Sequence, residues 1–533
     1  MKKYIVFALA CFSVIGVQAQ EKLKSEIIDV VKDFRPKIME AHKIKSQPLF
    51  IDTSKVSENL SYLIRFEEFR VQQFIDSLYA QVLKRTPLNN LYTKHIELGL
   101  GSLINPHLAL DLSNGRSTKS IYQAYLNYGG AFSENLNPQQ KNSYLNLGGA
   151  YKRVFNECVL QSDLLIEDKL RFDFLDTSYR NSTIAFNTAF HFTDTAKVLV
   201  PKEIILSSDV FFRNLQFNEF EISLATLHSG NYKQLRDWDF INDLAFIQSG
   251  DLYTNHWKSS IASEKSIDRS KLLLGINTDL LANDFKVFPE LRAQYELIKK
   301  GLFAYSELGG NREVYNLRTV YGANPFTNES SIITNNVLPS NTKYFVRVGI
   351  NGNLFRGVSY QVSVEANRQD SFMHFAQLIQ DNTQQNLSLS PMFTEVNMVK
   401  LNAQIDAKWT DKFHIWLKGE YKSFDQYLSH VPELKIGLYG DYHYNDQWFV
   451  SSSVRYIGTR SYLVLNEAIS PLTPTLPYDV NPMIDVNCKV NFAYNMQIGF
   501  YLEGQNLLDN SYDFWQEDLL IGRRLNVGAK YRF

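Results

Sequence analysis

Hydrophobic and polar residues alternate one by one along much of this chain. Every second position from 525 to 533 is apolar or aromatic, and the alternate positions from 524 to 532 hold Arg524, Asn526, Gly528, Lys530 and Arg532. A period of two predicts a β-strand, because successive side chains of a strand lie on opposite faces. One face of such a strand suits lipid, and the other suits water or a polar interior.

The same pattern recurs far upstream. Residues 358–365, 399–409 and 484–494 each alternate between an apolar and a polar set. Further alternating segments lie near residues 92–103, 107–113, 119–130, 142–155, 157–166, 181–193, 202–214, 217–229, 270–280 and 284–298. Together they predict an all-β fold, a large transmembrane antiparallel β-barrel of about 20 strands, with an even number between about 18 and 22. Residues 230–269 fit either two poor strands or one long insertion.

The connections between these segments are expected to alternate in length, as in outer-membrane barrels. Short links are predicted near residues 352–353, 410–411, 445–446 and 494–495, and long links near 311–341, 368–397 and 458–481. Because the last strand ends the chain, this parity places the short turns in the periplasm and the long loops outside.

A soluble, exported β-protein is the alternative interpretation of the alternating pattern. Its apolar faces would have to be buried, and a soluble protein seldom has so many of them to cover. The aromatic content of 14% also favours the membrane barrel, since Tyr and Trp concentrate at the two membrane interfaces.

The N-terminus has the features of a secretory signal peptide. Lys2 and Lys3 precede the apolar stretch Tyr4–Val17, and Val17-Gln18-Ala19 fits a small-residue cleavage pattern. We therefore expect residues 1–19 to direct export and the mature chain to reside in the outer membrane. Cys11 could alternatively mark a lipoprotein cleavage site, but the apolar run continues beyond it.

Charge and cysteine content narrow the remaining classes. The 55 Lys and Arg residues balance 56 Asp and Glu residues, for a net charge of −1, so no nucleic-acid partner is expected. Beyond residue 19 the chain keeps only Cys158 and Cys488, which we expect to be free thiols on different walls of the barrel. No later stretch reaches 18 consecutive apolar residues, so no spanning helix is predicted.

Three C-terminal segments resemble the end of TonB-dependent receptors. They are Gly504-Gln505-Asn506-Leu507-Leu508-Asp509-Asn510-Ser511-Tyr512, Ile521-Gly522-Arg523-Arg524 and Tyr531-Arg532-Phe533. The resemblance implies a 22-stranded outer-membrane transport barrel. It also implies that the barrel-assembly machinery reads the terminal aromatic residue, so this machinery and outer-membrane lipid are the expected partners.

The N-terminal region departs from that family. Its members carry a glycine-rich plug domain, whereas residues 20–98 contain no glycine, the residue that tight turns with positive φ favour. We therefore expect an N-terminal extension over residues 20–91, without a full plug domain, followed by the barrel over residues 92–533. The extension is either a loose periplasmic or luminal segment, or an arm that enters the barrel or binds a periplasmic or outer-membrane protein partner.

The sequence shows no local motif for catalysis, and no catalytic, cofactor-binding or metal site is predicted. The ten His residues are scattered, without the spacing of metal ligands. A rim-mounted enzyme could use His191 with Asp194, or His374, but no orienting partner is evident. Charges of both signs are expected in the lumen, as a hydrated path or as ion pairs that fill it: Glu365, Lys400, Asp406, Lys408, Asp441, Asp485 and Lys489.

The expected function is the passage of small polar solutes across the outer membrane by a TonB-dependent receptor-like barrel. The alternatives are a plugless barrel subunit of an outer-membrane assembly or secretion complex and, less favoured, a rim-mounted enzyme. An open lumen of this strand number would leak large molecules, so the N-terminal arm, the loops or a partner should block it.

Overall fold

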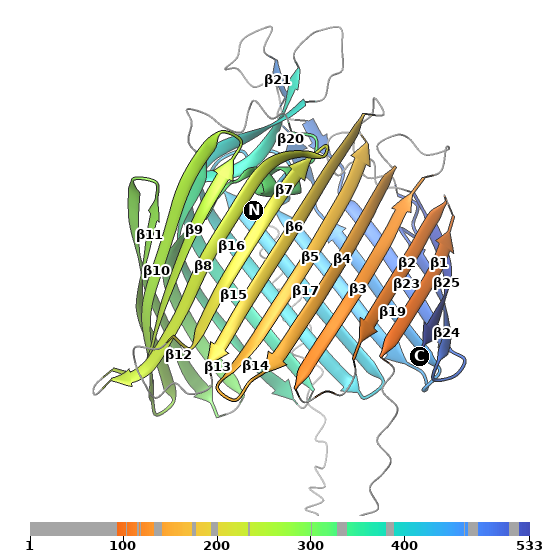
Figure 1. Ribbon diagram of the computed structural model, residues 1–533, viewed down its shortest axis with the longest axis horizontal. Coiled ribbons are helices and arrows are strands. Elements are labelled where there is room, and N and C mark those ends of the chain that lie inside the picture. The colour runs from red at the N-terminus through yellow and green to blue at the C-terminus, as the bar shows by residue number, and fades with distance from the viewer. Residues whose placement is uncertain are drawn as a thin grey trace, which may run out of the picture. The chain divides into compact units, whose positions relative to one another are not determined.

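The alternating segments form antiparallel strands that join into one wall (Figure 1). The computed structural model describes residues 93–102, 104–114, 117, 119–132, 141–172, 177–192, 201–232, 235–299, 301–327, 338–355, 357–379, 388–462, 464–466, 478–510 and 522–533. Of the two units into which the chain divides, Met1–Arg85 and Thr86–Phe533, only the second contains described residues. The expected signal peptide and the N-terminal extension, for which no full plug domain is expected, therefore lie outside the described residues.

The elements follow one another along the chain with a single short helix among the described residues. They are β1 (Lys94–Gly101), β2 (Asn105–Ser113), β3 (Ser120–Ala131), β4 (Asn142–Val154), β5 (Cys158–Phe172), β6 (Ser178–Phe192), β7 (Glu203–Arg213), β8 (Gln216–Tyr232), β9 (Leu235–Ser249), β10 (Leu252–Ile267), β11 (Ser270–Leu281), β12 (Asp284–Ile298), β13 (Leu302–Val314), α2 (Leu317–Ala323), β14 (Ser340–Phe355), β15 (Val358–Ile379), β16 (Ser388–Thr410), β17 (Phe413–Phe424), β18 (Leu434–His443), β19 (Trp448–Ile457), β20 (Arg460–Tyr462), β21 (Val464–Asn466), β22 (Tyr478–Val480), β23 (Met483–Ala493), β24 (Ile498–Gln505) and β25 (Arg524–Arg532).

Twenty-two of the described strands close into a ring. Each strand from β1 to β19 pairs with the next, β19 pairs with β23, and β25 returns to pair with β1 from His95↔Arg532 to Gly101↔Asn526. The remaining short strands lie outside the ring: β20 pairs with β22, and β21 runs parallel to the end of β15. The strand count is 22, the upper end of the range expected from the sequence. The described residues contain no helix whose length and apolarity would let it span a bilayer.

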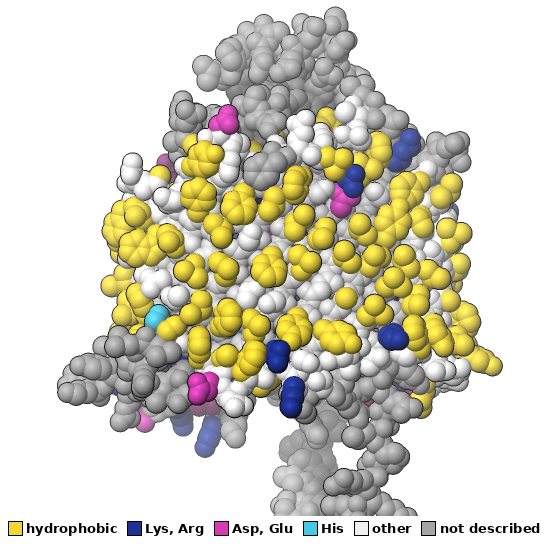
Figure 2. Space-filling view, viewed as in Figure 1, with side chains coloured by type: hydrophobic (Ala, Val, Ile, Leu, Met, Phe, Trp, Pro, Cys, Tyr) yellow, Lys and Arg dark blue, Asp and Glu magenta, His cyan; other side chains and the backbone are white. Residues whose placement is uncertain are grey.

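The two faces of the wall differ as the sequence predicted. Val364 is 41% exposed on the outer face, whereas its neighbour Glu365 is 1% exposed on the inner face. The same contrast holds between Val527, at 57%, and Asn526, at 8%. Figure 2 shows hydrophobic side chains across the middle of the outer surface, with charged side chains towards its two ends. This arrangement matches the apolar band of a membrane barrel.

The predicted connections are only partly correct. Short turns at residues 411–412, 444–447 and 494–497 and long links at 315–339 and 458–482 confirm the predicted positions. The turn expected at Gly352-Asn353 is wrong, because both residues lie within β14 and the strand ends at Phe355. The long link expected at 368–397 is also wrong, since β15 and β16 together occupy most of it as a tall hairpin.

The strands from β7 to β12 depart from the expected alternation of turns and loops. Tight two-residue turns join them at both ends, at residues 214–215, 250–251, 268–269 and 282–283. These turns use left-handed backbone at Asn214, Leu215 and Ala282 as well as at Gly250. Leu and Ala are unusual in that conformation, but the breaks predicted between residues 214 and 217 and between residues 280 and 284 fall at two of these turns. The uncertain stretch 230–269 holds the end of β8 and the two strands β9 and β10.

The wall has a seam between β12 and β13. Their pairing extends only from Leu291↔Leu308 towards the short-turn end, so residues 284–290 have no partner on β13. Pro289, which has no backbone N–H, and the pair Gly309-Gly310 lie where the pairing stops. Phe288, 1% exposed, packs against Gly310 there. Side chains rather than backbone hydrogen bonds therefore close this part of the wall.

Candidate functional site

The loop between β13 and β14 folds inward across the lumen and carries α2. Asn316 caps the helix, because its side-chain oxygen accepts a hydrogen bond from the backbone N–H of Thr319 at 2.9 Å. Leu317, Val320 and Tyr321 follow at helical spacing on one face, and each is at most 1% exposed. Their burial stabilises the folded loop by roughly 1.5–3 kcal/mol per side chain.

Polar contacts fasten this loop to the inner faces of β6, β7 and β8. The backbone N–H of Leu317 donates to Glu219 Oε2 at 2.7 Å, and Arg318 pairs with Asp209 at 3.0 Å. The guanidinium of Arg213 lies 3.6 Å from the ring centre of Tyr321 and donates to the carbonyl of Thr327 at 3.0 Å. These contacts draw the loop away from its own strands towards a distant part of the wall.

The other side of the loop packs on β15 and β16. The Tyr315 hydroxyl accepts from the backbone N–H of Met373 at 3.3 Å, and its ring lies 5.6 Å from that of Phe393. Burial raises the pKa of Tyr315 to about 12, so its hydroxyl stays protonated. A hydrophobic cluster that includes Phe211 of β7 and Phe375 of β15 surrounds α2. The loop thus bridges the lumen between separate parts of the wall and narrows its long-loop end.

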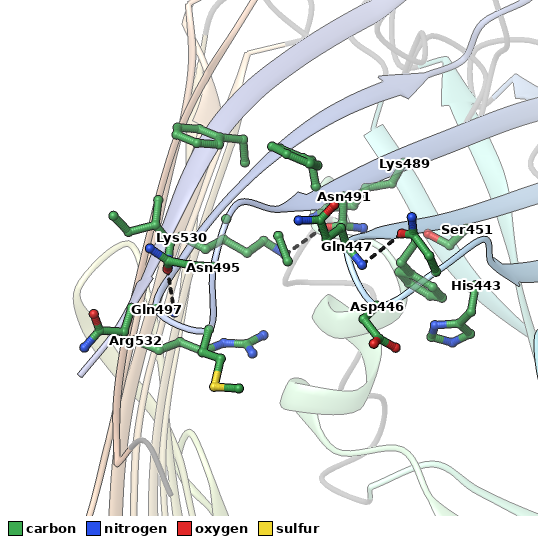
Figure 3. A pocket seen from close by; sticks show the side chains of 18 of the residues that line it. His443, Asp446, Gln447, Ser451, Lys489, Asn491, Asn495, Gln497, Lys530 and Arg532 are labelled. Carbon is green, nitrogen blue, oxygen red and sulfur yellow. Dashed lines mark hydrogen bonds between the residues drawn. The ribbon is translucent and has the colours of Figure 1, made fainter. Parts of the chain in front are cut away.

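The opposite end of the lumen contains a hollow of about 900 Å³ beside the turns 444–447 and 494–497 (Figure 3). Asn445 and Asn495 fix these turns, since each side-chain oxygen accepts two backbone N–H groups at 2.6–2.9 Å. Lys530 of β25 lies 3.3 Å from Glu97 of β1 and donates to Asn491 at 2.9 Å. Side chains therefore reinforce the junction of the first and last strands from inside.

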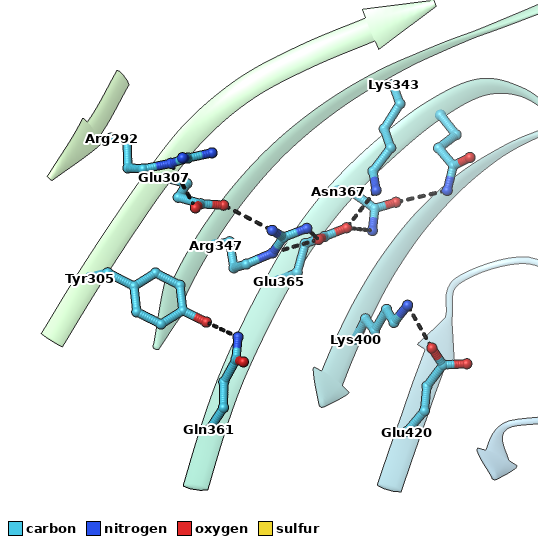
Figure 4. Close-up of polar contacts among 11 residues, drawn as sticks. Arg292, Tyr305, Glu307, Lys343, Arg347, Gln361, Glu365, Asn367, Lys400 and Glu420 are labelled. Atoms are coloured by element: carbon cyan, nitrogen blue, oxygen red, sulfur yellow. Dashed lines mark hydrogen bonds and ion pairs between the residues drawn. The ribbon is translucent and has the colours of Figure 1, made fainter. Parts of the chain in front are cut away.

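A second network of charges covers the inner faces of β12 to β17 (Figure 4). Arg347 bonds Glu365 through Nε at 3.0 Å and Glu307 at 2.8 Å, and Glu307 also pairs with Arg292 at 2.9 Å. Lys343 forms a further ion pair with Glu365 at 2.7 Å. Shared partners of this kind fix the positions of several long side chains and leave few charges of this network uncompensated.

The charges that the sequence placed in the lumen lie there, and most form ion pairs. Lys400 bonds Glu420 at 2.5 Å, and Asp441 lies opposite His414 in the strand register. The other ion pairs are Lys408 with Asp411 at 3.6 Å, Asp485 with Arg455 at 3.1 Å and Lys489 with Glu97 at 3.5 Å, while Asp406 contacts the His414 ring at 3.1 Å. Of the two interpretations left open by the sequence, a network of ion pairs describes most of these residues.

The two histidines considered for catalysis lie apart. His191 ends β6 and is 3.4 Å from Glu203, while Asp194 lies outside the described residues. His374 is 2% exposed, and its two ring nitrogens contact Thr394 at 2.8 Å and the backbone N–H of Ser429 at 3.3 Å. Both contacts tie β15 to its neighbours, which is a structural role.

Cysteine and metal chemistry can be stated for the described residues. Cys158 on β5 and Cys488 on β23 are free thiols, as predicted. No group of three or more His, Cys, Asp or Glu side chains with metal-binding geometry occurs in the described part of the chain.

The sequence analysis predicted the long link between β13 and β14 but missed the helix α2 and its inward packing. Asn316 followed by apolar residues at positions 317, 320 and 321 is a helix-start signal that could have identified the helix. Its partner Glu219 lies 98 residues away, so no local pattern could have predicted where the helix packs.

Comparison with known proteins supports the architecture. No protein-family model and no curated protein matches the chain. Similar solved structures include the pyoverdine outer membrane receptor FpvA from Pseudomonas aeruginosa PAO1, with a TM-score of 0.62, 12% identity and coverage of 83% of this chain and 78% of that one. The siderophore receptor PirA from Acinetobacter baumannii has a TM-score of 0.62 and 11% identity, with coverage of 83% and 81%.

The copper transporter OprC is similar as well, with a TM-score of 0.60, 10% identity and coverage of 83% of this chain and 82% of that one. At these identities the likeness is one of fold. The described barrel thus has the 22-stranded fold of TonB-dependent outer-membrane receptors.

Proposed function

We propose that this chain is an outer-membrane transport protein that passes small polar solutes through its lumen. The observation that carries the proposal is a closed 22-stranded ring with an apolar outer face and a charged inner face. The loop that carries α2 bridges the lumen and supplies the constriction that such a wide barrel needs. Receptors for siderophores and a copper transporter share the fold, which supports transport, and these two cargoes are candidates here.

The expected biogenesis belongs to the same proposal. Residues 1–19 direct export, the short turns face the periplasm and the long loops face the outside. The barrel-assembly machinery inserts the protein by way of the C-terminal strand that ends in Phe533. Fractionation with the outer membrane and heat-modifiable migration on a gel are the expected results, and recovery as a soluble periplasmic protein would contradict them.

Planar-bilayer conductance tests the transport function. The purified full-length protein should conduct small ions, and the double variant Leu317→Ala with Tyr321→Ala should conduct more because the bridging loop loses its buried contacts. Tyr427→Ala is the matched control, since Tyr427 belongs to another loop at the same end and is 39% exposed. Absence of conductance in all three proteins would contradict the proposal.

Removal of residues 20–85 addresses the N-terminal extension. The shortened barrel should still insert, because the first described strand begins at Lys94. A rise in conductance would assign the extension to the lumen, whereas unchanged conductance with loss of a co-purifying protein would favour a subunit of a larger assembly. Failure to insert would contradict the boundary at residue 92.

A further inference from the structure

Four lysines converge on the inner faces of three neighbouring strands. Lys400 lies on β16, Lys418 and Lys422 on β17, and Lys435 at the start of β18. The strand register brings them together, because Lys400 is opposite Lys422 and Lys435 is opposite Glu420. Glu420 is the one acidic side chain between them. We call this group the lysine patch, and it carries a formal excess of three positive charges.

One acidic side chain, Glu420, serves four lysines. Glu420 is shared by Lys400 at 2.5 Å and Lys422 at 2.7 Å. Neither Lys418 nor Lys435 forms an ion pair with any described residue, and both are exposed to the lumen.

The surrounding acids are already occupied. Glu365 bonds Lys343 and Arg347, and Asp485 bonds Arg455. The ion-pair network that neutralises the adjacent wall therefore leaves the lysine patch positive.

The patch faces a hollow of suitable size. A volume of about 530 Å³ is lined by Lys418, Lys435, Arg347 and Arg455, together with Glu420 and Tyr439. Ligand pockets commonly enclose about 300–1,000 Å³. Cations from β14, β17, β18 and β19 thus border one space, as in pores that select anions through Lys and Arg side chains.

An aromatic surface adjoins the lysines. Tyr439 and Trp416 are cross-strand neighbours whose rings stack at 5.4 Å with an angle of 8° between them. The Tyr439 ring lies over Gly437, where an added Cβ would be 2.7 Å from its Cε2 atom. Gly437 is opposite Lys418 in the register, and Lys418 and Tyr439 line the same hollow. Such a surface suits the ring of a solute whose charged group contacts the lysines.

We propose that the lysine patch and the Trp416–Tyr439 pair form a binding site for small organic oxyanions, with a carboxylate or phosphate group attached to a ring. This inference rests on the proposed passage of solutes through the lumen, for which the site would select anionic solutes. Lys418 and Lys435 bind the oxyanion, and Tyr439 contacts the ring. Lys400 and Lys422 neutralise Glu420, which lines the same hollow.

Calorimetric titration of the detergent-solubilised full-length protein tests binding directly. Benzoate and phenyl phosphate are the probes for the two oxyanions, and benzyl alcohol is the uncharged control. Both anions should bind, and benzyl alcohol should not. The double variant Lys418→Gln with Lys435→Gln should raise the Kd at least about tenfold, because charge-assisted hydrogen bonds are lost.

The control variant Lys408→Gln removes one charge from the same inner face of β16, where Lys408 is paired with Asp411. It should change the Kd less than about twofold, since exposed ion pairs contribute little. Trp416→Leu should weaken both anions while leaving the salt dependence of binding unchanged. Equal affinity in the wild type and the double variant, with unaltered heat-modifiable migration, would overturn the site.

Ion selectivity in planar bilayers separates the site from the proposed function. If the protein conducts, the double variant should shift the reversal potential in a KCl gradient towards cation preference. If anion binding depends on Lys418 and Lys435 but the protein does not conduct, the binding site is supported and the passage of solutes is contradicted. If the protein conducts, its selectivity is unchanged in the variant and no anion binds, then passage is supported and the binding site is overturned.

Discussion

At the scale of single residues, Glu219 connects the barrel wall to the loop that crosses the lumen. Its Oε2 atom accepts hydrogen bonds from the backbone N–H of Leu317 at 2.7 Å and from Ser249 Oγ at 3.1 Å. One carboxylate therefore holds a helix that begins 98 residues later in the chain.

Glu219→Ala should release the loop without unfolding the barrel. A buried N–H group left without a partner costs about 1–3 kcal/mol, and this loss should expose Arg318 to trypsin. The measurement is the rate of cleavage at Arg318 in the detergent-solubilised protein. Glu290→Ala is the control, since Glu290 is an inner-face carboxylate that bonds Asn277 at 3.2 Å. Equal protection in the two variants would show that Glu219 does not hold the loop.

His430 makes the stability of the closed loop between β17 and β18 depend on pH. Burial, together with the nearby positive charges of Arg460 and of His374 when protonated, lowers the pKa of His430 to about 4. In the opened loop the imidazole should protonate near pH 6.5. The closed loop is therefore at full stability above about pH 6.5 and loses stability as the pH falls towards about 4.

Hydrogen exchange tests this sign. The amide of His430 donates to the carbonyl of Ser461 at 2.8 Å, and its protection should fall as the pH decreases from about 6.5 to about 4, after correction for the intrinsic exchange rate. His430→Asn should weaken this dependence, although His374 still accepts the Ser429 N–H, and Asn tolerates the backbone φ of 64°. Retention of the same pH dependence in the Asn variant would assign it to another group.

At the scale of elements, the sequence could predict the wall better than its connections. Alternation identifies strands such as β16 and β25 because lipid and lumen impose opposite demands on neighbouring residues. Breaks in the alternation located the turns at 214–215 and 282–283, each of which contains an Asn, but the stretch 230–269 could not be divided into β9 and β10. The luminal charges were predicted, but their pairing depends on strand register, which a single sequence does not specify.

Arg312 stabilises the wall beside the seam between β12 and β13. Its fully buried guanidinium bonds Asp279 at 3.2 Å and the backbone carbonyl of Asp284 at 3.1 Å, beside the seam where β12 has no partner on β13. Arg312→Met would leave the buried Asp279 with less compensation, and removing one partner of a buried ion pair costs about 3–5 kcal/mol.

The expected result is a lower temperature for the loss of heat-modifiable migration. Arg292→Met is the matched control: Arg292 lies on the paired part of β12 and its side chain is 55% exposed. A loss of stability in the control as large as that in Arg312→Met would contradict a special role for the seam.

At the scale of the whole molecule, the described barrel is one ring whose parts depend on closure. The first and last strands meet through seven register pairs, with Glu97 and Lys530 on the inside. The ring creates both the outer apolar surface and an interior in which the bridging loop and the lysine patch lie. Insertion, closure and any passage of solutes are therefore properties of the complete ring.

Val527→Arg tests this dependence on closure from the lipid side. Val527 is 57% exposed on the outer face of β25 and pairs with Leu100 of β1. A lipid-facing Arg costs about 2–4 kcal/mol near the bilayer midplane and less towards the interfaces, so the folded outer-membrane fraction should fall.

Lys530→Gln is the control on the opposite face of the same strand, and it keeps an amide donor for Asn491. It should change the folded fraction little, because its ion pair with Glu97 is only one contact in the closing network. Equal losses in the two variants, measured by heat-modifiable migration of outer-membrane fractions, would mean that the faces of the closing strand are assigned wrongly.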